Sequence, residues 1–346
     1  MKHLLKTLPL LFVLTLIGCN GNSKDVNVKP KNGTKVEAAE FFDALAETEE
    51  SMLSRQAIGI KATKLALDAD IKESDVADKK LEPKDDAKIK LSEGSVTMNV
   101  KGITKEKNPE NATAEIHVDT KVDITLNLVD GEKPADSSIK GQVKPNIYSE
   151  KGILYLDLDK GTGDVVKKLA KATGGTVPIT FPGQYSLEGA VDFSSFSIDL
   201  DAEEMRDGYN ALSAEQKQKV TFQKYSDTSY SVWVDHLITE EVEKTEDNKY
   251  VLGTEKTDIQ ASMVIDTKLG ITEANFIIEE ESSDTVYSEL RYQSTFVESE
   301  YEEAFLNSEI SHQKINGQGS VSFSYDDKVK VTLPDNLDSY SPLMFY

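Results

Sequence analysis

The sequence predicts a mainly β fold with a few helices (α+β), in which long antiparallel strands form a curled, half-barrel-like sheet covered by helices. Apolar and polar residues alternate through most of the chain after residue 56, as half-buried strands require. These runs follow one another through short polar turns, which favours antiparallel neighbours, and only a few segments carry helix-capping residues. The apolar face of such strands needs a cover. Helices on a concave face supply it in the curled sheet, and a second sheet supplies it in the alternative, a β-sandwich.

The first residues have the layout of an export signal. Lys2 and Lys6 precede an uncharged run, Leu8–Ile17, that is too short to cross a bilayer core of ~30 Å. The run ends in Leu16-Ile17-Gly18-Cys19, which resembles the lipobox of bacterial lipoproteins. The resemblance implies cleavage between Gly18 and Cys19 and attachment of a diacylglyceryl group to the Cys19 sulfur. An ordinary signal peptide that is cut elsewhere is the alternative.

Cys19 is the only cysteine of the 346 residues, so an exported chain offers it no intramolecular disulfide partner. Residues 1–18 are therefore interpreted as a lipoprotein signal peptide. Residues 19–36 are interpreted as a lipidated cysteine and a flexible tether rich in Asn, Lys and Gly. Because two or three acyl chains hold a protein permanently on a membrane, we expect a protein anchored to the extracytoplasmic face, at the cell surface or in the periplasm.

The charge balance restricts the partners. With 61 Asp and Glu against 39 Lys and Arg, the formal net charge is -22, and removal of Lys2 and Lys6 leaves 37 against 61, or -24. The chain has only three Arg and no basic stripe, which excludes nucleic acid as a partner. Anionic lipid head groups repel a body of this charge, so the anchor must hold the protein by itself.

Residues 37–335 are expected to form a single large antiparallel β domain. Its first element is a helix that begins at the Thr34-Lys35-Val36-Glu37 capping box, with an apolar stripe from Ala38 to Leu53 that includes Phe41 and Phe42. From residue 56 onward the apolar period changes to two. The strands predicted in this first half contain residues 65–71, 96–100, 114–118, 122–128, 139–143 and 153–158.

The middle of the chain contains helical insertions near residues 164–173 and 201–219. The first runs from Asp164 to Thr173 and ends at Gly174-Gly175, where a left-handed backbone is easily adopted. The second has two starts, Asp201-x-x-Glu204 and Ser213-x-x-Gln216, in which each side chain can satisfy a free backbone amide. A strand is expected between the two insertions, at residues 191–200.

The second half returns to strands, with a short helix at residues 300–307 before the last of them. The predicted strands contain residues 230–238, 259–265, 271–279, 286–296 and 320–333. Residues 336–346 form a C-terminal tail. Its apolar end, from Ser341 to Tyr346, either docks on the body or contacts a partner.

The order of these elements resembles the curled-sheet lipoprotein carriers, the LolA and LppX/LprG-like group. The shared features include a lipidated cysteine, an amphipathic helix, a mid-chain helical insertion and a hairpin with Asp266 near its turn and Gly270 before the return strand, with Pro334 after the last strand. The resemblance covers roughly residues 36–335, and this chain has extra strands before residue 158. It implies a half-open barrel whose apolar concave side holds an acyl chain. A packed core is the interpretation of the alternation that the strands alone favour, and an apolar void of several hundred Å³ distinguishes the two.

The sequence contains no recognisable catalytic pattern. His117, His236 and His312 lie far apart, and no His-Glu-x-x-His motif, Gly-x-Ser-x-Gly elbow or zinc-binding cysteine set occurs. Lys160-Gly161-Thr162-Gly163 follows a strand, but Val166 stands where a dinucleotide loop needs its third glycine. These glycines are interpreted as a turn from strand to helix.

Two acidic pairs and the single tryptophan have structural interpretations. Asp157/Asp159 and Asp199/Asp201 lack the spacing of a calcium loop and are interpreted as strand ends and helix caps. Trp233 lies between Val232 and Val234, so it is either an anchor on the outer face of its strand or a core residue with inverted register.

These observations predict a non-enzymatic, lipid-anchored extracytoplasmic lipoprotein with no cofactor and no metal, attached to the membrane through Cys19. The first hypothesis is that it binds or carries a hydrophobic ligand, such as a lipid, in the curled sheet; the sequence does not identify the ligand-binding residues. The second is a surface structural or protein-interaction lipoprotein with a packed core and no ligand. The sequence does not identify a protein partner for either hypothesis.

Overall fold

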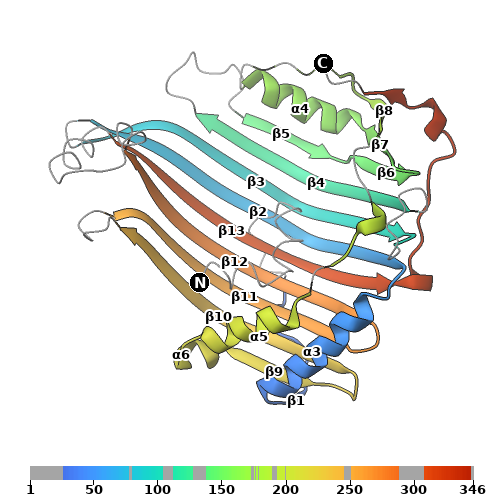
Figure 1. Cartoon of the computed structure of the whole chain (residues 1–346). Helices are drawn as coiled ribbons and strands as arrows, with labels where there is room; N and C mark the ends of the chain where they lie inside the picture. Colours follow the sequence, from blue (N-terminus) through green and yellow to red (C-terminus); the bar gives the residue numbers. More distant parts are fainter. Residues whose placement is uncertain are drawn as a thin grey trace, which may run out of the picture.

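The computed structural model describes residues 26–77, 80–103, 112–127, 138–172, 175, 177, 179–188, 193–198, 200–244, 251–287 and 308–343. Their strands form one large sheet that curls without closing on itself (Figure 1). The fold is mainly β with few helices, as the alternating pattern predicts. The alternative of a β-sandwich is wrong, because the described strands pair edge to edge in a single sheet and helices cover its concave face.

The sheet has 14 strands in the order β1-β9-β10-β11-β12-β13-β2-β3-β4-β6-β7-β8-β14, with β5 paired to β4. The pairings are antiparallel except that of β14 with β8, which is parallel. The strands are β1 (Thr34–Lys35), β2 (Ala57–Ala77), β3 (Lys80–Lys101), β4 (Thr113–Asn127), β5 (Ser138–Val143), β6 (Asn146–Glu150), β7 (Ile153–Leu158), β8 (Gly183–Glu188), β9 (Val220–Lys224), β10 (Ser229–Lys244), β11 (Val251–Asp266), β12 (Gly270–Tyr287), β13 (Ser308–Tyr325) and β14 (Ser341–Pro342).

Three of the β-bulges in the described strands contain a residue with positive φ. The register shifts in β2, β3 and β10 at Lys64, Glu93 and His236, whose φ values are 55°, 53° and 52°. A bulge adds one unpaired residue, bends its strand and increases the local twist. It also changes which residues face the concave side beyond it, so apolar residues of both halves of a strand reach the same face. The bulges therefore contribute to the curl of the sheet.

The helices lie on one face of the curled sheet (Figure 1). They are α3 (Ala38–Met52), α4 (Lys160–Ala172), α5 (Ala202–Ala211) and α6 (Ala214–Lys217). Phe41 and Leu45 of α3 are fully buried in the main core, together with Ile265 and Ile271 of the β11–β12 hairpin. At the other end of the sheet α4 packs on β5, where a Cβ added to Gly141 would lie 2.5 Å from Val165 Cγ2. None of the helices in the described part of the chain has both the length and the apolarity needed to cross a bilayer.

Two of the three predicted capping pairs, those at Asp201 and Ser213, are confirmed. The Asp201 carboxylate accepts the Glu204 amide at 2.8 Å, and Ser213 and Gln216 form a reciprocal capping box. The predicted capping box at Thr34 is wrong. Thr34 lies in β1 and pairs with Lys224 of β9, and α3 begins at Ala38 without a side-chain cap. Strand pairing fixes Thr34 in an extended conformation away from the helix, so its side chain is not available to cap it.

The helix predicted from Asp164 begins four residues earlier, at Lys160. Asp159 accepts hydrogen bonds from the amides of Gly161 and Thr162, which satisfies donors of the first turn. The two glycines predicted as a turn therefore lie inside α4. They allow close packing, because a Cβ on Gly163 would lie 2.2 Å from Phe181 Cβ.

Two predicted strands are wrong at least in part. In the region 191–200, residues Phe193–Ser195 form a 3-10 turn, and Leu200 is buried in the core without lying in a strand. The last strand, predicted to reach Leu333, ends at Tyr325, and Val329 is 1% exposed but outside any strand. In both regions the alternation of apolar and polar residues results from burial of the apolar side chains, without strand pairing. Leu53, expected in the apolar stripe, is 65% exposed because the helix ends at Met52.

The C-terminal tail docks on the body through residues 337–343. Leu337 and Tyr340 are buried beside Tyr148 and Tyr155, and β14 extends the sheet at β8. Of the other predictions, Gly18, Cys19 and the lipobox, the 286–296 strand beyond Tyr287 and the 300–307 helix lie outside the described residues.

Candidate functional site

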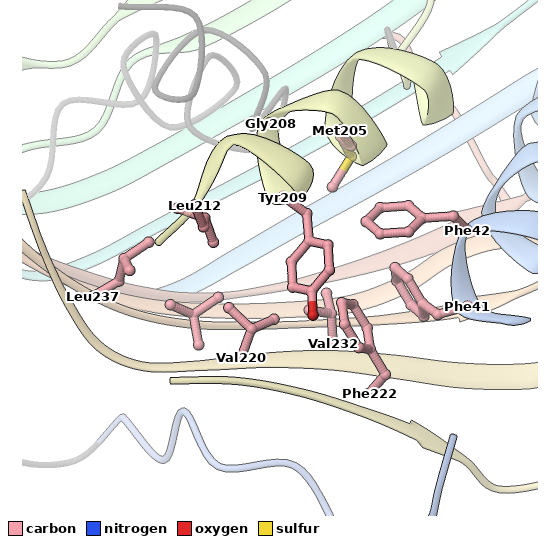
Figure 2. A pocket seen from close by; sticks show the side chains of 11 residues that line it. Phe41, Phe42, Met205, Gly208, Tyr209, Leu212, Val220, Phe222, Val232 and Leu237 are labelled. Atoms are coloured by element: carbon pink, nitrogen blue, oxygen red, sulfur yellow. The ribbon is translucent and has the colours of Figure 1, made fainter. Parts of the chain in front are cut away.

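The concave face carries an apolar pocket of about 80 Å³ between the helices and the strands of one sheet edge (Figure 2). Two helices, the segment after α5 and two strands supply its wall. The lining residues are Phe41, Phe42, Met205, Gly208, Tyr209, Leu212, Val220, Phe222, Val232, Val234 and Leu237. The Tyr209 hydroxyl is the only polar side-chain group in this set. Such a wall favours apolar groups through dispersion and exclusion of water.

Four aromatic rings form one side of the pocket. The ring centroid of Phe222 lies 5.0 Å from that of Phe41, 5.6 Å from that of Phe42 and 5.2 Å from that of Tyr209. The Phe42 and Tyr209 centroids are 5.8 Å apart. These separations lie in the range of tilted and edge-to-face ring pairs, each worth about 0.5–1.5 kcal/mol beyond burial. The rings therefore pack α3, α5 and β9 against one another.

The strand wall depends on the bulge in β10. Val232 and Val234 face the pocket by simple alternation, and regular pairing would place His236, not Leu237, on the same face. The shift between Val234 and Leu237 includes His236, whose φ is 52°, and Leu237 is placed in the pocket wall. The His236 ring lies 2.9 Å from the Asp258 carboxylate, so the residue has a structural partner on β11.

Few polar contacts join α5 to α3. Glu49 of α3 accepts the Ala202 amide at 3.2 Å, at the start of α5. Arg206 pairs with Asp43 at 2.8 Å, but the two side chains are 43% and 75% exposed, so this pair contributes at most about 1 kcal/mol. Packing of the aromatic rings is the main interaction that closes the pocket.

Three cationic side chains lie over aromatic rings of the pocket and of the neighbouring core. Arg206 is 5.8 Å from the Phe42 centroid, and Lys217 is 5.4 Å from that of Tyr209. Lys224 is 5.0 Å from the Tyr230 centroid and 3.1 Å from Glu40. Hydrogen bonds to Tyr230 and Glu40 raise the pKa of Lys224 above its ordinary value. These cationic groups lie over the ring faces, and none of them lines the pocket, whose wall is apolar.

The structure does not bring the polar residues singled out in the sequence into one site. His117 lies beside Asn146 on β6, His236 beside Asp258 on β11, and His312 on β13. Within the described ranges, no three His, Cys, Asp or Glu side chains gather as metal ligands would.

Two of the acidic residues interpreted as strand ends and helix caps have structural partners. Asp201 caps α5, and Asp159 caps α4. Partial burial acts to raise the pKa of Asp159, but hydrogen bonds from Thr162 and Gly161 hold it below its ordinary value. Their interpretation as helix caps is confirmed for these two; Asp199 lies outside the described residues.

The sequence analysis predicted none of the lining residues as ligand-binding residues. Phe41 and Phe42 belong to the predicted apolar stripe, whereas Met205, Tyr209 and Leu212 were missed. Their spacing of four and three residues indicates an apolar helix face and was the available signal. Trp233 faces away from the pocket, with Lys29 5.0 Å from its ring centroid, which confirms the outer-face interpretation.

Comparison with known proteins adds no functional assignment. No protein-family model matches the chain, and no curated protein sequence matches it.

Proposed function

We propose that this protein is a non-enzymatic, lipid-anchored extracytoplasmic lipoprotein that binds an apolar ligand in the pocket of its concave face. The observation that carries the proposal is the pocket wall, in which all ten lining residues other than Gly208 are apolar or aromatic. The lipobox residues Leu16-Ile17-Gly18-Cys19 support attachment through Cys19. Replacing Cys19 by Ser should release the chain from the membrane fraction.

The volume of the pocket limits the ligand. About 80 Å³ is roughly half of an engineered apolar cavity of ~150 Å³ that binds benzene. The end of an acyl chain is a suitable occupant, and burial of about four methylene groups contributes ~3 kcal/mol. Tighter binding requires a wider pocket, which outward movement of α5 would supply. We therefore propose binding of a chain end rather than enclosure of a whole lipid.

A pocket-filling variant tests the proposal. Gly208→Leu places a branched side chain at the pocket wall, and Ala211→Leu adds the same side chain at an exposed position of the same helix. The anchor-free Cys19→Ser protein should bind cis-parinaric acid, measured by its fluorescence. We expect Gly208→Leu to weaken binding about tenfold, equivalent to ~1.4 kcal/mol, and Ala211→Leu to leave it unchanged. Equal binding by the two variants would contradict the proposed site.

The second candidate function is a structural or interaction lipoprotein with a packed core. The small volume of the pocket favours it, since a carrier is expected to keep a void of several hundred Å³. The same preparation distinguishes the candidates. Absence of both parinarate binding and extractable lipid, measured by mass spectrometry of the purified protein, would favour the interaction role.

A further inference from the structure

The segment before α3 is held on the sheet by several contacts. Val26 and Val28 are 6% and 7% exposed. The Lys29 ammonium lies 5.0 Å from the Trp233 ring centroid, and the Tyr225 hydroxyl donates to the Lys31 carbonyl at 3.0 Å. We call residues 26–35 the N-terminal strap. The tether expected over residues 19–36 is thus fixed from Val26 onward.

The strap continues to the edge of the sheet. The Gly33 amide donates to the Gln223 side chain at 3.2 Å, and a Cβ on Gly33 would lie 2.8 Å from the Lys224 carbonyl oxygen. Thr34 and Lys35 then pair with β9 as β1. Glycine at position 33 therefore lets the strap approach β9 closely.

The strap and the pocket lie on opposite faces of the same strands. Phe222 and Val232 line the pocket, whereas their neighbours Gln223 and Trp233 contact the strap. Successive side chains of a strand point to opposite faces, so the strap covers the convex face. Figure 2 shows the blue N-terminal trace on the side of the strands away from the pocket side chains.

We propose that the strap orients the protein on its membrane, with the convex face of β9 and β10 against the lipid head groups and the pocket facing away from the bilayer. This inference rests on the proposed lipidation of Cys19. Cys19 and Val26 are seven positions apart in the sequence, so their Cα atoms are separated by at most about 25 Å. The acyl chains therefore enter the bilayer within about 25 Å of Val26, where the strap begins.

The charge of this segment suits the lipid surface. Residues 20–36 contain four Lys and one Asp, whereas the whole mature chain has a net charge of -24. Basic residues next to an anchor are attracted to anionic head groups, and an acidic body is repelled by them. The basic strap therefore favours contact with anionic head groups, whereas the acidic body as a whole does not. The partner of the convex face is thus a bilayer that contains anionic lipid.

The only tryptophan of the chain tests the orientation. The full lipidated protein is reconstituted in vesicles of phosphatidylcholine and phosphatidylglycerol that contain nitroxide-labelled head groups. Because the strap holds this face at the head groups, we expect Trp233 fluorescence to fall about twofold or more relative to nitroxide-free vesicles. A Trp233→Phe/Ala211→Trp variant carries its probe on exposed α5, on the pocket side, and should show little quenching.

Two further variants test the cause. An insertion of 20 Gly and Ser residues between residues 25 and 26 adds about 25 Å of reach and should abolish preferential quenching of Trp233. Lys31→Gln/Lys35→Gln should make quenching insensitive to phosphatidylglycerol. Equal quenching at positions 233 and 211, or none at 233 in protein that floats with vesicles, would overturn the orientation alone. Protein that does not float with vesicles would overturn the proposed anchor and this inference with it.

Discussion

Arg55 should contribute more to stability than any exposed ion pair of this chain, because its guanidinium joins three elements. It donates to the Asp326 carboxylate at 2.8 Å, to the Ser51 hydroxyl at 2.7 Å and to the Lys268 carbonyl. Its side chain is 14% exposed and lies 5.4 Å from the Tyr325 ring centroid. The contacts fix the C-terminal end of α3 on the β11–β12 hairpin, while the other half of α3 lines the pocket.

The expected loss for Arg55→Ala follows from these contacts. A hydrogen bond to a charged group contributes about 1.5–3 kcal/mol, and Arg55 makes such bonds to a carboxylate and to a carbonyl. The Asp326 side chain is 40% exposed, so solvent reduces its share. We expect Arg55→Ala to lower the free energy of unfolding by about 3 kcal/mol and Arg55→Lys by about half as much, since lysine keeps the charge but lacks the planar fork.

Urea unfolding followed by Trp233 fluorescence measures the loss, and a double-mutant cycle with Asp326→Asn isolates the pair. Burial acts to raise the pKa of Asp326, but the hydrogen bonds from Arg55 and Gln56 lower it below the ordinary 3.8. The stabilisation of the folded state by the ionised Asp326 carboxylate is therefore present above pH 3.8. It is lost as the pH falls through the lowered pKa that this group has in the folded protein. Arg55→Ala should reduce this acid sensitivity. A loss below about 1 kcal/mol, with no coupling to Asp326, would refute the reasoning.

Three smaller predictions concern other parts of the sheet. Gly270→Ala should destabilise by about 2 kcal/mol, because φ is 121° and the added Cβ would lie 2.7 Å from the Tyr325 hydroxyl; urea unfolding measures it, and an unchanged midpoint would contradict the strain. Ser213→Ala removes the α6 capping box and should cost about 1 kcal/mol by the same assay, whereas the exposed Ala211→Ser should be nearly neutral. Burial and Glu255 raise the pKa of Glu280, so ionisation destabilises the fold as pH rises from about 4.5; Glu280→Gln should be more stable than the wild type at neutral pH, with a difference that disappears in acid.

Local patterns predicted those parts of the fold whose causes are local. Period-two alternation located most of the long strands, and Asp201 and Ser213 cap their helices as their spacing requires. The hairpin at Asp266 is also confirmed. Its carboxylate accepts the Lys268 and Leu269 amides, and Gly270 adopts the left-handed φ that the return requires. Each feature depends on residues within four positions of one another, so sequence reasoning could reach it.

The pocket depends on contacts that no local pattern specifies. Its wall combines α3 with residues 205–212 and 220–237. Strands β2 to β8 lie between these segments and α3 in the sequence. The apolar face of α5 was visible in the sequence, but its position over β9 and β10 was not. The bulge at His236 lacks a Gly or Pro signal, and without it the placement of Leu237 cannot be predicted.

The strap also helps to hold the short edge strand β9 in place. β9 has five residues, and only the two residues of β1 pair with its outer edge. Its position therefore depends on packing against both faces, through Phe222 toward the pocket and Gln223 toward the strap. A ligand that displaced α5 would remove the contact of Phe222 with Tyr209, but Phe222 would keep its contacts with α3 and Gln223 its contact with Gly33. Since β9 also stays paired with β10, we infer that the fixed N-terminus lets the pocket widen without loss of the edge strand, which a fully flexible tether would not do.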